Sequence, residues 1–280
     1  MKKLFAIAIL VSNFVFAQNT NDNTSEKPSR LFKKGSVMLF WGWNQAKYSK
    51  SDIHFKGKGY DFELDHVVAH DRQTPFEFGK YFNPGSITVP QVNYRITYFP
   101  VDRLGITLGM DHMKYVVDQE QTVDFRGYIS DPKYASMIKN GKVDLTDANF
   151  LTFEHTDGLN YINVGAQKYH EVMHRKHVDL YLSYGGGFGA LLPKSNVMLM
   201  GNERSDRFHL AGFGVDMRMA ASLILAHHIV LQAEGKLGYI NMADIKTTLN
   251  DQPDHALQDF VFAQYNIGIG YTFNTTRRSN

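Results

Sequence analysis

The stretch FVFAQYNIGIGYTF, residues 260–273, alternates between two kinds of side chain. Its odd-numbered positions, from Val261 to Phe273, are all apolar or aromatic, whereas the even-numbered positions after Phe262 carry Gln, Asn, Gly and Thr. Successive side chains of a β-strand point to opposite faces. The stretch is therefore predicted to be a strand with one face suited to lipid and one suited to a crowded polar interior. It exceeds the usual soluble strand of about 5–6 residues and suffices for a tilted membrane crossing of about 9–11 residues.

The same period of two recurs along the chain and predicts eight strands: 36–48, 87–99, 105–118, 157–171, 177–191, 209–225, 229–242 and 259–273. Short links at 100–104, 172–176 and 226–228 alternate with long links at 49–86, 119–156, 192–208 and 243–258. Short turns on one side and long loops on the other are typical of outer-membrane barrels. We therefore predict an all-β fold, an eight-stranded antiparallel transmembrane up-and-down β-barrel with long extracellular loops. A ten-stranded barrel remains the alternative.

The start of the chain has the features of a secretory signal peptide. Lys2 and Lys3 precede the apolar run 4–16, and Ala17 is small enough to end a cleavage site. The run is too short for an uncleaved membrane anchor of about 20 residues. The predicted organisation is a signal peptide over 1–17, a flexible periplasmic segment over 18–33, the barrel over 34–273 and a C-terminal tail over 274–280.

Composition narrows the function classes. The formal net charge is +2, and the two lysines of the signal account for it, so a polyanionic partner such as nucleic acid is not expected. Cysteine is absent, which excludes disulfides and thiolate chemistry, and nothing indicates a cofactor. No stretch after the signal reaches 18 uninterrupted apolar residues, so no transmembrane helix is expected.

A soluble lipocalin-like barrel or β-sandwich is the competing fold. Such proteins bury their apolar face inside, and a small soluble barrel has little room for the aromatic residues of the apolar faces. These aromatics are Trp41, Trp43, Tyr94, Tyr98, Tyr265, Tyr271 and Phe273. Many lie near strand ends, as in the interfacial girdle of a membrane barrel, so we predict the outer membrane as the location.

When the same alternation is applied to every predicted strand, a set of charged residues falls on the inward face, in the lumen of the barrel. The set is Arg95, Asp111, Asp179, Asp216, Arg218, Glu234 and Lys236. An eight-stranded barrel is only wide enough for side chains to fill it, and buried charges are tolerated when paired. Asp216/Arg218 and Glu234/Lys236 lie on adjacent predicted strands. We expect a neutralised ion-pair network that holds the barrel shut, in preference to a proton path or a selective channel.

The segment 153–161 carries the strongest candidates for chemistry, Glu154, His155 and Asp157. It weakly resembles the rim motif His-x-Ser-Asn of the lipid A deacylase barrels, with His155 at the His position. Asp157 stands where the nucleophilic Ser belongs, and Thr156 would face away from His155. The carboxylates and His155 also suit the Asp/His site of the omptin proteases, which have ten strands. We expect a structural turn at Asp157-Gly158, with a rim acyl hydrolase as the alternative.

Histidines gather in three links. His66 and His70 lie in the first, while the pairs His174/His177 and His227/His228 flank two of the short turns. Paired histidines can bind zinc or copper. Without cysteines or a clear further ligand, no metal site is predicted.

The segments 41–44, 51–57, 111–115 and 154–161 together resemble a family of small Gram-negative outer-membrane β-barrel proteins, within the broader OmpA/OmpX-like eight-stranded group. The resemblance implies fold and location. Residues 52–64 alternate around a Gly-containing turn and predict a hairpin above the membrane. The expected function is non-enzymatic, the presentation of a structured extracellular surface for recognition or as a subunit of a larger assembly. The expected partners are outer-membrane lipid and lipopolysaccharide, together with other outer-membrane proteins.

Overall fold

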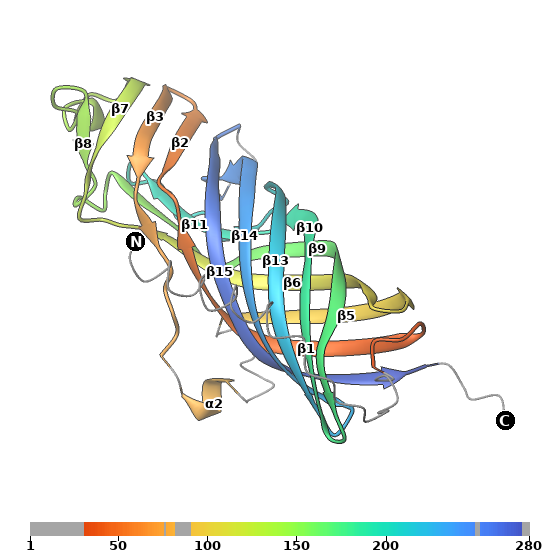
Figure 1. Ribbon diagram of the computed structural model, residues 1–280. Helices are drawn as coiled ribbons and strands as arrows, with labels where there is room; N and C mark the ends of the chain where they lie inside the picture. The colour runs from red at the N-terminus through yellow and green to blue at the C-terminus, as the bar shows by residue number, and fades with distance from the viewer. Residues whose placement is uncertain (1–30, 76, 82–90, 250–252, 276–280) are drawn as a thin grey trace.

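A closed ring of antiparallel strands forms the body of the protein (Figure 1). The computed structural model describes residues 31–75, 77–81, 91–249 and 253–275, apart from the side chains of residues 156 and 157. The ring follows the order β1 (Ser36–Tyr48), β5 (Val92–Val101), β6 (Leu104–Val117), β9 (Leu151–Arg175), β10 (Val178–Leu191), β13 (Gly212–Leu225), β14 (Ile229–Lys246) and β15 (His255–Asn274). β15 pairs back with β1 from Ser36↔Asn274 to Tyr48↔Phe262, which closes the ring.

The antiparallel all-β prediction is confirmed, but the described chain has more strands than the predicted eight. The additional strands arise because the long links form β-structure of their own. They are β2 (Ser51–Gly57), β3 (Tyr60–Val67), β4 (Ala69–His70), β7 (Thr122–Ile129), β8 (Lys142–Asp144), β11 (Lys194–Leu199) and β12 (Arg207–Phe208). Two single-turn helices complete the described elements, α2 (Phe78–Tyr81) and α3 (Pro132–Ala135). In the described part of the chain, no helix has the length and apolar character needed to cross a bilayer.

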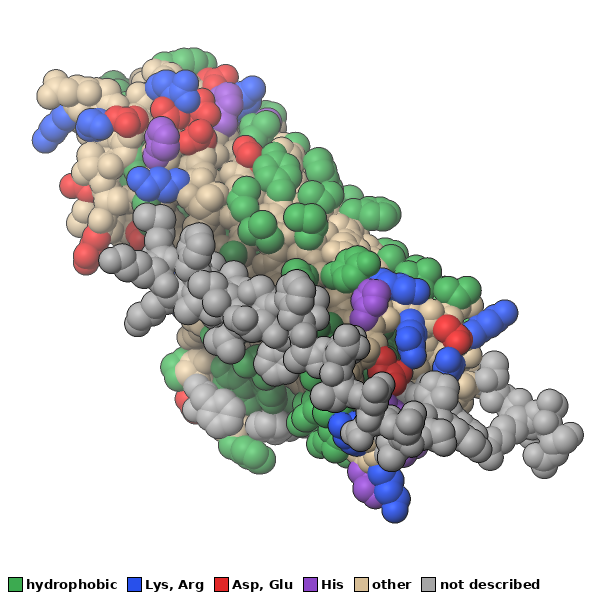
Figure 2. Space-filling view, viewed as in Figure 1, with side chains coloured by type: hydrophobic (Ala, Val, Ile, Leu, Met, Phe, Trp, Pro, Cys, Tyr) green, Lys and Arg blue, Asp and Glu red, His purple; other side chains and the backbone are tan. Residues whose placement is uncertain are grey.

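The outer wall of the ring is apolar. Every ring strand exposes large hydrophobic side chains, for example Leu39, Ile96, Leu108, Val164, Leu182, Met217, Leu237 and Ile267. On the face shown in Figure 2, charged side chains gather at the two ends of the molecule and hydrophobic side chains lie between them. So large an exposed apolar surface marks a membrane contact, and a closed ring leaves no unpaired strand edge in lipid. The protein is a β-barrel of the outer membrane.

The long links build a second, thicker layer at one end, which we call the loop end. β15 continues beyond the ring and pairs with β2, and the sheet then runs β2–β3–β7–β8. On the other side, β11 pairs with the first residues of β9. The hairpin predicted over 52–64 is thus confirmed as β2 and β3, with Gly59 at φ 85° in its turn. We call the sheet β2–β3–β7–β8 the extension.

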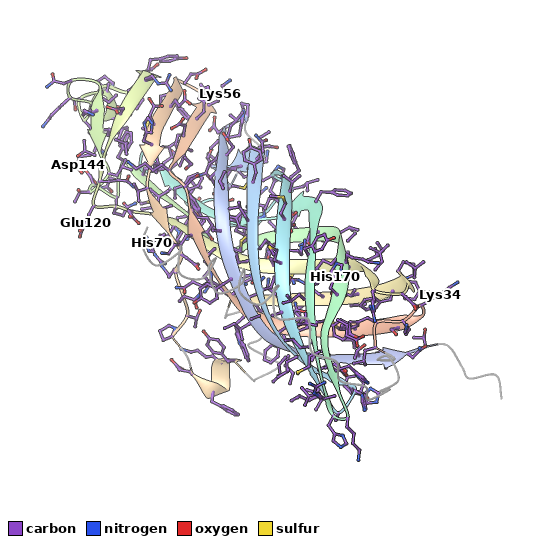
Figure 3. The ribbon with its side chains drawn as sticks, viewed as in Figure 1. Lys34, Lys56, His70, Glu120, Asp144 and His170 are labelled. Carbon is purple, nitrogen blue, oxygen red and sulfur yellow. The ribbon has the colours of Figure 1, made fainter. Side chains whose placement is uncertain are left out.

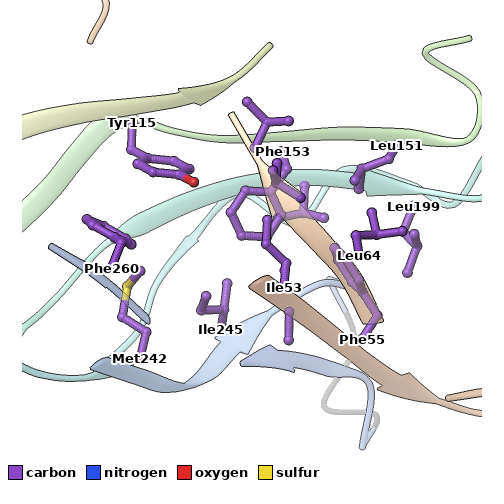
Figure 4. Close-up of a cluster of buried hydrophobic side chains, with 14 of the residues drawn as sticks. Ile53, Phe55, Leu64, Tyr115, Leu151, Phe153, Leu199, Met242, Ile245 and Phe260 are labelled. Carbon is purple, nitrogen blue, oxygen red and sulfur yellow. The ribbon is translucent and has the colours of Figure 1, made fainter. Parts of the chain in front are cut away.

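The extension and the upper ring enclose an apolar core. Figure 4 shows its side chains converging from several strands, among them Ile53 and Phe55 of β2, Leu64 of β3, Phe153 of β9 and Phe260 of β15. Phe55 and Phe62 stack at 5.1 Å between ring centroids, as do Phe62 and Phe125. This core gives the loop end a fixed shape, because each large apolar side chain that is buried stabilises the fold by about 1.5–3 kcal/mol.

A second apolar cluster closes the opposite end, which carries the short turns and which we call the turn end. Phe32 is fully buried there, with its ring centroid 4.9 Å from Phe99, 4.7 Å from Tyr169 and 4.8 Å from Tyr181. Its carbonyl accepts a hydrogen bond of 2.7 Å from the amide of Arg103. Residues 31–33 were expected to belong to a flexible segment, and the structure corrects that boundary, because Phe32 fills the mouth of the barrel. The predicted signal 1–17 and residues 18–30 lie outside the described residues.

Candidate functional site

Charged side chains fill the middle of the barrel between the two apolar clusters. Arg95 donates from Nη1 to Glu234 Oε2 at 2.6 Å and from Nη2 to Asp111 Oδ1 at 3.4 Å. Lys236 donates to the other oxygen of Asp111. Asn266 donates to Glu234 Oε1 at 2.9 Å. The carboxylate of Glu234 is thereby bound on both oxygens, as a buried charge requires.

Arg218 forms the second half of this lumen network. Its Nε and Nη2 each donate to Asp216 at 2.7 Å, a bidentate pair within one strand. Tyr161 adds a hydroxyl donor to Asp216 Oδ2 at 2.9 Å, and Asn163 accepts from Arg218 at 3.1 Å. Asn163 also donates to Asp111 at 3.5 Å, which joins the two halves.

The structure therefore brings together six of the seven charged residues named from the sequence, with partners that differ in part. Arg218 pairs with Asp216, but Glu234 lies against Arg95 and Lys236 against Asp111. The barrel curvature explains this difference, because side chains reach across the narrow lumen as well as to the adjacent strand. Asp179 is not in the network. It is buried at the turn end and accepts a hydrogen bond from His174.

Glycine makes room for the central guanidinium. A Cβ on Gly187 of β10 would lie 2.4 Å from Arg218 Nη2 and 3.0 Å from Asp216 Oδ2. Any side chain at this position would displace the bidentate pair. The glycine-rich run of β10, which the sequence shows only as small residues, thus has a specific packing role.

Gly187→Ala is expected to lower the free energy of unfolding by about 1–3 kcal/mol, the usual cost of overpacking. Urea unfolding of the barrel in vesicles, followed by tryptophan fluorescence, measures this. Gly235→Ala is the matched control, because a Cβ there would meet no atom within 4 Å. Equal stability of the two variants would contradict the packing role.

The rim segment 153–161 is part of strand β9 and does not form the expected turn. Residues Met113 and Tyr115 of β6 pair with Leu159 and His155, so β9 bulges over residues 156–158. Gly158 takes the positive φ of 131° that this bulge needs. The turn prediction was wrong because β6 continues alongside β9 on both sides of Asp157-Gly158, so the strand accommodates this pair as a bulge and does not reverse direction.

Because successive side chains of β9 point to opposite faces, the candidate catalytic groups Glu154 and His155 are separated. Glu154 lies on the outer face, where Arg72 approaches at 3.2 Å, Arg204 at 3.6 Å and Asn196 donates at 2.6 Å. His155 points into the apolar core and is fully buried, in edge-to-face contact with Phe153 at 5.1 Å. The side chain of Asp157 lies outside the described residues. Glu154 therefore ties two loops to β9, and it does not meet His155.

Among the described side chains, a hydroxyl that contacts His155 is that of Ser195 in β11, which adjacent sequence does not reveal because it lies 40 residues away. Its Oγ is 2.9 Å from His155 Nδ1, and both residues are buried. Burial lowers the pKa of His155 to about 3. A general base works best with a pKa near the operating pH. A buried imidazole of such low basicity is suited to structure, with Ser195 as its hydrogen-bond partner.

The depressed pKa of His155 predicts a pH dependence of stability. The imidazole stays neutral in the folded protein down to about pH 3, whereas in the unfolded chain it gains a proton below about 6.5. Its stabilisation is therefore complete above pH 6.5 and falls as the pH drops toward 3. Between pH 7 and 4.5 we expect the wild type to lose roughly 2–3 kcal/mol more than His155→Gln. Urea midpoints across this range test it, and parallel curves would contradict it.

No family model and no curated protein matches this chain. Solved structures do resemble it. Outer membrane protein OprG from Pseudomonas aeruginosa is 13% identical, with a TM-score of 0.41 over 87% of this chain and 98% of that one. AlkL, an outer membrane protein studied in lipid bilayers, is 10% identical, with a TM-score of 0.38 over 93% of this chain and 100% of that one.

The outer membrane protease OmpT from Escherichia coli is 11% identical, with a TM-score of 0.35 over 85% of this chain and 97% of that one. These neighbours are small Gram-negative outer-membrane β-barrel proteins. At such identities and TM-scores they carry no argument about function, which has to come from the geometry of this chain.

Proposed function

We propose that this protein is a non-enzymatic outer-membrane barrel of the OmpA/OmpX-like kind, whose eight ring strands span the membrane. In this orientation the turn end faces the periplasm and the loop end faces outward. The outer surface of the ring contacts membrane lipid and lipopolysaccharide. The ordered extension serves as a recognition surface or as the docking site of a larger outer-membrane assembly.

The observation that carries this proposal is the fixed core under the extension. Loops that only connect strands have no need of a shared interior, yet Phe62 is 1% exposed and Leu64 fully buried at this end. A surface that is ordered before binding loses less conformational entropy when a partner docks. The filled lumen supports the same reading, because a network of paired charges occupies the path that a channel would need.

The outward face of the extension is polar and laid out in cross-strand pairs. His54 lies 2.5 Å from Asp61, Arg126 binds Asp65 through two contacts of 2.7 Å, and Lys142 pairs with Asp124. Such exposed pairs stabilise the fold little, so their effect is to hold side chains in place. Tyr128 stands among them with 57% of its surface exposed, and tyrosine is enriched where proteins bind one another. Figure 3 shows Lys56 and Asp144 at this end and Lys34 at the opposite one.

A mild-detergent pull-down from native outer membranes tests the proposal. The wild type is compared with the double variant Tyr128→Ala/Arg126→Ala and with Lys34→Ala as a control at the turn end. A stoichiometric partner that the double variant loses and the control keeps is the expected result. Retention of every partner by the double variant, or ion conductance of the purified barrel in planar bilayers, would contradict it.

The acyl hydrolase alternative makes its own prediction. Neither His155 nor Ser195 is open to a lipid, so lipid A from cells with and without the gene is expected to carry the same acyl chains. Mass spectrometry of lipid A measures this, with His155→Ala and Ser195→Ala as companion strains. Loss of an acyl chain that requires the gene, His155 and Ser195 would establish the enzyme.

A further inference from the structure

The turn end carries a carboxylate that the lumen network does not include. Asp179 is completely buried, and its Oδ1 accepts a hydrogen bond from His174 Nδ1. Its Oδ2 is equally buried and accepts no hydrogen bond from the residues that the structure describes. A buried carboxylate oxygen without a donor costs free energy, so this atom is suited to a positively charged ligand.

A second imidazole faces that oxygen. His227, in the turn between β13 and β14, places Nδ1 3.9 Å from Asp179 Oδ2, too far for a hydrogen bond. The position is fixed by the backbone, because His227 holds a positive φ of 64° and the amide of Ala226 donates to the carbonyl of His177 at 3.0 Å. The two short turns of this end are thereby joined, and His227 remains about half exposed, which leaves an entry path.

We propose that Asp179 and His227 bind one divalent first-row metal ion of the zinc or copper type, with His174 as the positioning residue. Bonds from such an ion to carboxylate oxygen and imidazole nitrogen are about 2.0–2.2 Å long. Two of them together slightly exceed the 3.9 Å between Oδ2 and Nδ1, so a single ion reaches both atoms. His174 holds the other carboxylate oxygen, the kind of outer contact that orients metal-binding carboxylates. Water completes the coordination on the exposed side of His227.

The neighbouring histidine does not compete for this role. His228 Nδ1 is hydrogen-bonded to the carbonyl of Thr272 at 2.8 Å, and its ring stacks on Tyr271 at 5.3 Å. The acidic group Asp52/Glu63/Asp65 at the loop end is also a weaker candidate, because Arg126 already binds two of its carboxylates, Glu63 and Asp65. The bound ion would tie the β9–β10 turn to the β13–β14 turn and strengthen the closed turn end.

Zinc titration of the untagged mature protein, folded in detergent micelles, tests this proposal by calorimetry. Asp179→Asn removes the charge at constant shape, and His227→Asn removes the imidazole with a residue that tolerates positive φ. His54→Ala is the matched control, since His54 also contacts a carboxylate, that of Asp61, but at the opposite end. Heat-dependent gel migration verifies that each variant is folded.

One Zn²⁺ per barrel is expected in the wild type and in His54→Ala. Asp179→Asn and His227→Asn should each abolish Zn²⁺ binding, while His174→Gln should weaken the affinity by about 10–100-fold. Electron paramagnetic resonance with Cu²⁺ should show nitrogen coupling that His227→Asn removes. A wild type that binds no Zn²⁺, or binding that survives both Asp179→Asn and His227→Asn, would overturn the site.

Discussion

Arg218→Ala is expected to lower the free energy of unfolding by about 3–5 kcal/mol, the usual cost of removing one partner from a buried pair. Asp216 would keep the hydroxyl of Tyr161 as a donor but lose both guanidinium contacts of 2.7 Å. Both side chains of the pair are fully buried, so water cannot replace the cation without opening the barrel. Urea unfolding in vesicles, read from the fluorescence of Trp41 and Trp43, measures the loss.

Two further variants make this result specific. Lys58→Ala removes an exposed cation from the turn between β2 and β3 and should change stability by no more than about 0.5 kcal/mol. Arg218→Met combined with Asp216→Asn removes both charges and should recover most of the loss, because the penalty comes from the unpaired carboxylate. Equal stability of Arg218→Ala and Lys58→Ala would show that the lumen is hydrated and that the network does not stabilise it.

The ring was predictable because each of its strands has one face in lipid and one in a crowded interior. Met217, Met219, Ile267 and Ile269 are all exposed on the face that alternation assigned to lipid. The lumen residues follow from the same alternation, since Arg218, for example, lies between the exposed side chains of Met217 and Met219. Their exact partners do not follow, because contacts across the lumen depend on the stagger of strands far apart in the sequence.

The loop end was predictable only where it is local. The β2–β3 hairpin shows in residues 52–64 because its strands are joined by a tight turn. The pairing of β3 with β7, and of β15 with β2, depends on long-range contacts that alternation in one segment does not reveal. The Ser195–His155 contact follows the same rule, because it joins residues 40 positions apart on two different strands.

Phe32→Ala is expected to destabilise the barrel by about 3–5 kcal/mol, the usual range for a fully buried phenylalanine. The ring of Phe32 touches three aromatic rings of strands β5, β9 and β10, so its removal leaves a cavity in the turn end that the rigid barrel wall cannot close.

Phe208→Ala is the control for this prediction, because Phe208 is 58% exposed at the loop end and should contribute less than about 1 kcal/mol. Phe32→Leu keeps most of the buried volume and should lose clearly less than Phe32→Ala. Urea midpoints in vesicles compare the three variants. If Phe32→Ala unfolded at the same midpoint as Phe208→Ala, the segment before β1 would not be docked in the barrel mouth. If Phe32→Leu lowers the urea midpoint a little and Phe32→Ala lowers it much more, the stability at the turn end depends on the volume that the Phe32 side chain fills.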